Sequence, residues 1–189
     1  MNTAINLNIF NEFPELQSER LYFRAFIFSD AAHLFEIRSN AEVMTYMDRD
    51  AQTEVTESEK MIDGIQDSFE NKEGINWAII EKDSHEFIGY FGYWRIEAES
   101  CRAEIGYALK PEFQGKGYMR ETLKTMIAFG FNEMTLHSIE ANINPANVAS
   151  QRLLENASFK KEAHFRENWF FNGKFIDSAI YGLLESDFN

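Results

Sequence analysis

The chain has 189 residues, of which 44% are hydrophobic and 15% aromatic, and a chain of this size can bury one substantial core. Its formal net charge of −13 argues against nucleic acid as a partner, because proteins that bind a phosphate backbone carry basic surfaces. The charge suits a cationic acceptor or a basic protein, and it equally suits an acidic surface that only keeps the chain dissolved.

The sequence shows no pattern typical of a membrane span or of an export signal. No apolar run approaches a membrane span, and residues 1–20 lack a basic stretch followed by a long apolar segment. We therefore expect a cytoplasmic protein without a membrane partner. The single cysteine, Cys101, excludes an internal disulfide and is not expected to act as a nucleophile. The four histidines lack metal-ligand spacing, so we expect no metal site.

The first 74 residues predict one strand followed by three helical segments. No linker or repeat divides the sequence, so we expect a single domain over residues 1–189 with an N-terminal extension over residues 1–19. Residues 20–26 have a strand pattern. The third helix is expected to end before Gly74. The residues expected to cap the three helices are Ser29, Asn40 and the capping-box pair Thr56 and Glu59.

After Gly74 the hydrophobic period changes to two residues, which is typical of strands. The segments with this pattern, which predict an antiparallel meander, are 75–83, 86–96 and 101–109. An apolar stripe over residues 119–131 predicts a helix, and residues 136–144 return to a strand pattern. Strand, helix and strand should form a right-handed parallel crossover.

The last part of the chain predicts a helix and a hairpin. Asn147 is expected to cap the helix, and Asn172-Gly173 has the sequence of a tight hairpin turn. The residues expected on the inner side of the helix are Ala149, Leu153, Leu154 and Ala157.

The segment PEFQGKGYMRETL, residues 111–123, places two glycines between a predicted strand and a predicted helix. Amides at a helix N-terminus have no partner within the helix and carry partial positive charge, so a phosphate can satisfy several of them. Gly115 and Gly117 leave room for phosphate oxygens and allow positive φ. Four basic and two acidic side chains give residues 110–124 a charge of +2 in an acidic chain. The pattern favours an anion-binding loop.

Other interpretations of this loop fit less well or stay open. The Walker sequence GxxxxGK[ST] is absent. A dinucleotide fingerprint would use Gly115, Gly117 and Glu140, but Arg120 stands where the third glycine is needed and the preceding strands predict an antiparallel sheet. A glycine turn that binds no ligand is the purely structural alternative.

The stretch QGKGYM, residues 114–119, resembles the [QR]-x-x-G-x-[GA] signature of the GNAT superfamily of N-acetyltransferases, in which the loop holds the pyrophosphate of acetyl-CoA. Met119 replaces the last Gly or Ala, a departure that is common in the RimJ/RimL-type branch. Other stretches that resemble this branch are FEIRSNAEVMTYM (35–47), AEIGYAL (103–109), NVASQRLLENASF (147–159), with Ser158 for the usual glycine, and FFNGKFIDSAIYGLL (170–184). The resemblance covers residues 20–184.

The resemblance implies a mixed α/β fold, with a splayed and mainly antiparallel sheet of about seven strands and four or five flanking helices. It also implies acetyl-CoA as the co-substrate. Main-chain groups of Leu109 and Lys110 would bind the pantetheine arm, and the side-chain amide of Asn147 would either do the same or only cap its helix. The residues expected to bind the cofactor are Leu109, Lys110, Gln114, Gly115, Lys116, Gly117, Tyr118, Met119, Arg120, Asn147 and Ser150.

Two side chains are expected to act in catalysis. Alternation along residues 103–109 places Glu104 on the face of two small residues, so it could position or deprotonate the amine, or only pair with a basic neighbour. Ser150, which matches the serine of the branch's helix motif, could donate a hydrogen bond to the leaving thiolate, or only bond to its own helix. Many family members use a helix tyrosine for this step, but no tyrosine lies between Tyr118 and Tyr181.

The function expected from the sequence is therefore direct acetyl transfer from acetyl-CoA to an amine. The acceptor would be a small-molecule amine or a protein N-terminus, including that of a ribosomal protein. A non-catalytic module of the same fold that binds acyl-CoA is the alternative from another class. The chain is expected to be a monomer or a homodimer, and the sequence favours neither.

Overall fold

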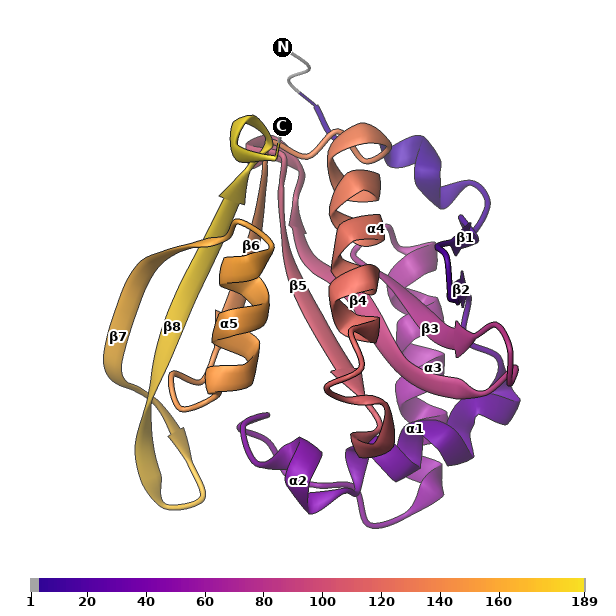
Figure 1. The fold of residues 1–189 in the computed structure, drawn as a ribbon, viewed down its shortest axis with the longest axis vertical. Coiled ribbons are helices and arrows are strands. Elements are labelled where there is room, and N and C mark those ends of the chain that lie inside the picture. Colours follow the sequence, from indigo (N-terminus) through magenta and orange to yellow (C-terminus); the bar gives the residue numbers. More distant parts are fainter. Residues whose placement is uncertain (1–3, 189) are drawn as a thin grey trace.

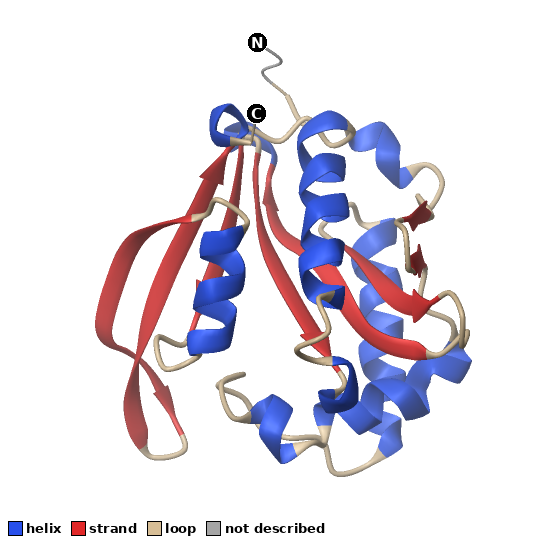
Figure 2. Cartoon of the chain, in the orientation of Figure 1, coloured by secondary structure: helices blue, strands red, loops and turns tan. Residues whose placement is uncertain are grey.

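The computed structural model describes residues 4–188, which form an open sheet with helices on both faces (Figures 1 and 2). The strands are β1 (Leu16–Gln17), β2 (Leu21–Arg24), β3 (Ile75–Glu81), β4 (Phe87–Glu97), β5 (Arg102–Leu109), β6 (Ser138–Ile143), β7 (Lys160–Phe171) and β8 (Lys174–Leu184). The helices are α1 (Ala31–Arg38), α2 (Ala41–Met44), α3 (Val55–Glu70), α4 (Tyr118–Asn132) and α5 (Val148–Asn156).

The eight strands lie in the order β1-β2-β3-β4-β5-β6-β8-β7. All neighbouring strands are antiparallel except β5 and β6, which are parallel and joined through α4. The predicted mixed fold with a mainly antiparallel sheet is confirmed, and so is the parallel connection between β5 and β6. The strand count exceeds the expected seven by one because the two-residue strand β1 extends the edge next to β2.

The sheet opens between β5 and β6. Their parallel pairing consists of Arg102 with Ser138, Ala103 with Ile139 and Glu104 with Glu140. Beyond this point β5 continues to Leu109 beside β4, while β6 continues beside β8 (Figure 1). The expected splay of the sheet is therefore a gap between two parallel strands.

Two buried clusters cover the two faces of the sheet. The larger cluster packs α4 and α5 on one face and includes Ile105, Met126 and Leu154. The smaller cluster packs α1 and α3 on the other face and includes Ala108 and Ile62. Because side chains alternate along a strand, β5 contributes Ala103, Ile105 and Leu109 to the first cluster and Ala108 to the second.

The N-terminal segment lies against the larger cluster. Ile5 and Phe10 are buried in it, and the Asn6 amide donates to Thr135 Oγ1 at 3.0 Å. No helix within residues 4–188 is both long enough and apolar enough to cross a bilayer.

Three local expectations are wrong. Ser29 lies inside a 3-10 turn, and α1 starts after Asp30, whose carboxylate accepts from Arg24 at 2.6 Å and from the Ile27 amide. The capping interaction of α3 lies two residues earlier than expected, because Glu57 accepts the amides of Thr53 and Glu54 at 2.8 and 3.1 Å. Both carboxylates accept amides of residues that precede the helix, and these charge-assisted hydrogen bonds set where each helix begins. The third is the predicted inward position of Ala149, which is exposed.

Other local expectations are confirmed. The Asn40 side chain accepts the amides of Glu42 and Val43, and Asn147 accepts the amide of Ser150. Asn172 and Gly173 have φ values of 46° and 76° and form the turn between β7 and β8. Two successive positive φ values are typical of the primed turns that match the twist of a hairpin.

The close approach of α4 to β4 depends on Gly130. A Cβ at this position would lie 2.4 Å from Tyr93 Oη, which is fully buried and donates to Met126 O at 2.8 Å. Gly130→Ala should therefore lower the free energy of unfolding by about 1–3 kcal/mol, measured by urea denaturation. In the matched variant Gly64→Ala the new Cβ meets nothing within 4 Å, so α3 should gain up to about 1 kcal/mol. Equal effects of the two substitutions would contradict this packing.

Candidate acetyl-transfer site

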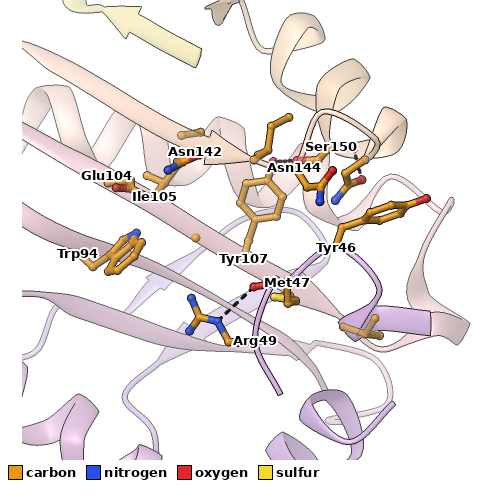
Figure 3. A pocket seen from close by; sticks show the side chains of 15 residues that line it. Tyr46, Met47, Arg49, Trp94, Glu104, Ile105, Tyr107, Asn142, Asn144 and Ser150 are labelled. Carbon is orange, nitrogen blue, oxygen red and sulfur yellow. Dashed lines mark hydrogen bonds between the residues drawn. The ribbon is translucent and has the colours of Figure 1, made fainter. Parts of the chain in front are cut away.

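A cavity of about 170 Å³ lies where β5 and β6 separate (Figure 3). The two strands form its sides, and the segment after α2 and the start of α5 complete its wall. Figure 3 shows Glu104 and Trp94 toward one end and Tyr107 and Ser150 toward the other. The lining residues are Val43, Tyr46, Met47, Arg49, Trp94, Glu104, Ile105, Gly106, Tyr107, Ala141, Asn142, Ile143, Asn144, Asn147 and Ser150.

The loop from β5 to α4 has the geometry of an anion site. Gly115 and Gly117 have φ values of 70° and 83°, and a Cβ on Gly115 would meet nothing within 4 Å, so the space in front of it is open. The first hydrogen bond of α4 runs from the Glu121 amide to Gly117 O at 3.1 Å. The amides of residues 118–120 precede this bond, so they have no acceptor within the helix. These donors and the open space fit a diphosphate.

The side chains of this loop divide between solvent and core. Lys116 and Arg120 are exposed, and the Lys116 ammonium lies 5.4 Å from the centre of the Phe113 ring. Met119 is buried in the larger cluster, so it can offer a ligand only its main chain. Two exposed cations therefore lie beside the amides of residues 118–120.

Arg20 braces the loop from outside, and the sequence pattern did not predict it. Its Nη1 donates to Lys116 O at 3.1 Å, and its Nε pairs with Glu121 Oε2 at 2.7 Å. The guanidinium lies 4.3 Å from the centre of the Tyr118 ring. Glu121 also accepts from Ser18 Oγ at 2.6 Å, and these hydrogen bonds lower the pKa of its carboxyl against the effect of burial. Arg20 and Glu121 are 101 residues apart, and no local pattern reveals such a pair.

At the end of β5, the amide of one residue faces the gap and the amide of the next residue pairs with β4. The Lys110 amide donates to Ile88 O at 2.9 Å, so this donor is already used in the pairing with β4. Since neighbouring residues of a strand direct their amides to opposite sides, the Leu109 amide points toward the gap. Gln114 Nε2 donates to Leu109 O at 3.1 Å and fixes the loop to the strand end.

The Lys110 side chain is buried on the other side and takes no part in the gap. Its ammonium lies 2.7 Å from Glu36 and 3.7 Å from Glu86, in α1 and just before β4. The hydrogen bond from Lys110 lowers the pKa of Glu36. Of the two strand-end residues expected to bind the pantetheine, Leu109 thus has a free amide, and Lys110 anchors the loop.

Ser150 and Tyr107 form a pair of hydroxyl groups in the cavity. Tyr107 Oη and Ser150 Oγ are 2.7 Å apart, and Ser150 is buried in the first turn of α5. Burial raises the pKa of Tyr107 to about 12, although the hydrogen bond with Ser150 acts in the opposite direction. Asn147 accepts the Ser150 amide through Oδ1, which leaves its side-chain Nδ2 as a donor. The sequence offers no tyrosine on this helix, but the structure places Tyr107 of β5 beside Ser150.

Glu104 lies at the last rung of the pairing between β5 and β6. Its side chain is only 6% exposed and pairs with Arg95 Nη1 at 3.1 Å, so the structure includes the basic neighbour considered above. Burial raises the pKa of Glu104, and its rung partner Glu140 raises it further, while Arg95 lowers it. The carboxyl is therefore an easier proton acceptor than an exposed one, and it lies where an amine could reach it.

The predicted site residues come from two faces of the sheet. Tyr107 and Ser150 lie on the face covered by α4 and α5, and alternation places Glu104 on the opposite face of β5. The gap joins the two faces because no strand fills it beyond the last pair. A loop whose amides can bind a diphosphate, two hydroxyl groups and a buried carboxylate lie near one gap, an arrangement that suits an acyltransferase with a diphosphate-containing carrier of the acyl group.

Comparison with known proteins gives the family. Residues 20–160 match the family model described as "Acetyltransferase (GNAT) domain". The chain therefore belongs to the GNAT acetyltransferase family, whose members use acetyl-CoA as co-substrate, and it is an acetyl-CoA-dependent N-acetyltransferase. The expected family, class of enzyme and co-substrate are confirmed.

Similar proteins extend over nearly the whole chain. The chain is 35% identical to "Uncharacterized N-acetyltransferase p20" of Bacillus licheniformis over 173 residues, which are 92% of this chain and 97% of that protein. It is 24% identical to the spermidine N(1)-acetyltransferase of Vibrio cholerae over 172 residues, covering 90% and 96% of the two chains. The solved structure of RimL, a ribosomal L7/L12 alpha-N-protein acetyltransferase in complex with coenzyme A, has the same fold, with a TM-score of 0.84, 21% identity and coverage of 93% and 100%.

Replacement of Gly117 tests the anion loop. Alanine at φ 83° is strained, and relief of this strain at the N-cap residue would displace the amides that begin α4, so Gly117→Ala should weaken coenzyme A binding at least about tenfold by calorimetry. Gly173→Ala is the matched control, because its φ of 76° imposes the same strain in a distant hairpin turn. Equal losses of affinity in the two variants would show that Gly117 serves only the fold.

Proposed function

We propose that the protein transfers the acetyl group of acetyl-CoA directly to a primary amine that enters the gap from the Glu104 face. The observation that carries this proposal is the arrangement of Glu104 on one face and of Ser150 with Tyr107 on the other, at one opening in the sheet. Direct transfer needs an amine and a thiol end to meet at a single point, and the gap offers that point.

The residues that would hold the co-substrate are those of the loop and of the two strand ends. The amides of residues 118–120 would bind the diphosphate, with Lys116 and Arg120 as mobile countercharges. The Leu109 amide and Asn147 Nδ2 would bind the pantetheine arm. When bound, acetyl-CoA supplies an acetyl group activated as a thioester.

Glu104 would accept the proton that the amine must lose. An alkylamine with a pKa near 10.4 is neutral in about one molecule in 2,500 at pH 7, which costs roughly 4.6 kcal/mol, whereas an α-amine near 8 costs only about 1.4 kcal/mol. A carboxyl whose pKa is raised by burial can receive this proton directly or through a water molecule. Ser150 would donate a hydrogen bond to the sulfur as the carbon–sulfur bond breaks.

The acceptor that we propose is a cationic amine, either a small molecule such as a polyamine or the N-terminus of a protein. The net charge of −13 and the opposed pair Glu104 and Glu140 favour approach of a cation. Relatives of both kinds support this range, since one acts on spermidine by name and RimL acts on a ribosomal protein.

A panel of amines tests the proposal directly. Thiol release from acetyl-CoA should accelerate with at least one member of a panel that contains spermidine, spermine, lysine and peptides with free N-termini, and the product should gain one acetyl group by mass spectrometry. Glu104→Gln should lower kcat/KM about 10²-fold or more, as expected for loss of a general base. Coenzyme A binding without turnover of any amine would instead favour a binding module.

The pH profile tests the role of Glu104. If the ionised carboxyl accepts the proton, kcat/KM rises with pH as Glu104 loses its proton, and because Arg95 lowers the pKa of Glu104, Arg95→Ala should move this rise to higher pH. Arg166→Ala is the control, since this arginine lies in the distant hairpin next to Asp177. An unchanged profile in Arg95→Ala would remove Glu104 as the titrating group.

A further inference from the structure

The proposed mechanism uses the hydroxyl of Ser150 but not the hydroxyl of Tyr107. Tyr107 belongs to β5 and lines the cavity, and its hydroxyl lies 2.7 Å from Ser150 Oγ. Its ring is parallel to the Phe91 ring of β4, with centroids 6.5 Å apart and an interplanar angle of 4°. Packing against a neighbouring strand of the sheet therefore positions the phenol ring.

The direction of this hydrogen bond decides what Ser150 can do. A serine hydroxyl has one proton, and if it donates that proton to Tyr107, it has none to offer a ligand. A phenol is the more acidic of the two hydroxyls, so the favoured arrangement has Tyr107 donating and Ser150 accepting. The Ser150 proton is then free to point into the cavity, and a donor whose oxygen already accepts a hydrogen bond is itself strengthened.

The Ser150 main chain is fixed from the other side. Its amide donates to Asn147 Oδ1 at 3.0 Å, which sets the start of α5. The backbone position thus comes from Asn147, and the rotation of the hydroxyl comes from Tyr107. The two constraints act on different atoms of one residue.

We propose that Tyr107 is a positioning residue that orients the Ser150 hydroxyl toward the sulfur of coenzyme A. Tyr107 donates a hydrogen bond to Ser150, and Ser150 donates one to the thiolate. This inference rests on the proposed function. Tyr107 acts through Ser150 and keeps its own proton.

The reaction balances without a proton from Tyr107. The nitrogen–carbon bond forms and the carbon–sulfur bond breaks, and the sulfur takes the electron pair of the broken bond. The cationic amine loses one proton to Glu104 or to solvent before it attacks, and the nitrogen loses a second one after its bond to carbon has formed. The sulfur gains one proton from solvent after the Ser150 hydrogen bond has stabilised its charge, so one proton is released overall. No oxidant or further reactant is needed.

The ionisation of the bound coenzyme A thiol is the direct readout. Full-length protein saturated with coenzyme A is titrated with base while the ultraviolet absorption of the thiolate is followed. The same protein saturated with desulfo-coenzyme A gives the baseline, which removes the absorption of the tyrosines. The other charged or titratable residues that line the cavity are Tyr46, Arg49 and Glu104, and Asp48 accepts a hydrogen bond from Asn144 in its wall. The variants described below leave all four residues in place.

Loss of either hydroxyl should make the bound thiol harder to ionise. A hydrogen bond to a charged group is stronger than one between neutral groups, so Ser150→Ala should raise the apparent pKa of the bound thiol by about one unit or more. Tyr107→Phe should raise it by a smaller amount, because Ser150 remains but is no longer oriented. The double variant should match Ser150→Ala, since Tyr107 acts only through Ser150.

Tyr181→Phe is the matched control. Its hydroxyl also reaches α5, where it donates to Glu155 at 3.4 Å, so this variant loses a buried tyrosine hydroxyl bonded to the same helix but not to Ser150. It should leave the thiol pKa unchanged. A Tyr107→Phe effect of equal size with and without Ser150, or no effect at all, would overturn the inference while the proposed function stands. Failure of the wild-type protein to bind coenzyme A would overturn both.

Discussion

The structure depends on one interruption of a hydrogen-bonded ladder. β5 and β6 pair over three rungs, from Arg102 with Ser138 to Glu104 with Glu140, and then separate. Strands in the middle of a sheet normally pair their main-chain groups on both sides. Where two such strands separate, their donors and acceptors need another partner. Here each strand keeps its outer neighbour, β4 or β8, and the inner edges are left for a ligand. The cavity, the unpaired amide of Leu109 and the meeting of the two sheet faces all follow from this separation.

The connection that separates the strands also supplies the anion site. α4 must leave the end of β5 and return to β6, so the loop between β5 and α4 lies beside the gap (Figure 1). Its amides offer the charge complementary to a phosphate in a chain that is otherwise strongly acidic. Arg20 and Gln114 fix the loop to β2 and β5, so the amides need little reorganisation when a ligand arrives.

Local patterns predicted the features that local physics determines. The strand and helix periods, the Asn40 and Asn147 caps and the Asn172-Gly173 turn concern residues a few positions apart. Ser29 and Thr56 failed as caps because the carboxylates of Asp30 and Glu57 bind amides that precede each helix and so set where the helix begins. Arg20 with Glu121 and Tyr107 with Ser150 are separated by 101 and 43 residues, so only the folded sheet brings them together. The anion-binding loop was predicted from its glycines and charge, and Ser150 was predicted through resemblance, whereas the residues that support them required the structure.

Hydrogen–deuterium exchange along the whole chain, with and without coenzyme A, tests this account most directly. The amides of residues 118–120 and of Leu109 should exchange more slowly once the ligand is bound, because they change from donors without a partner to bonded ones. Coenzyme A that binds tightly, leaves these amides unaffected and protects another surface would contradict the account.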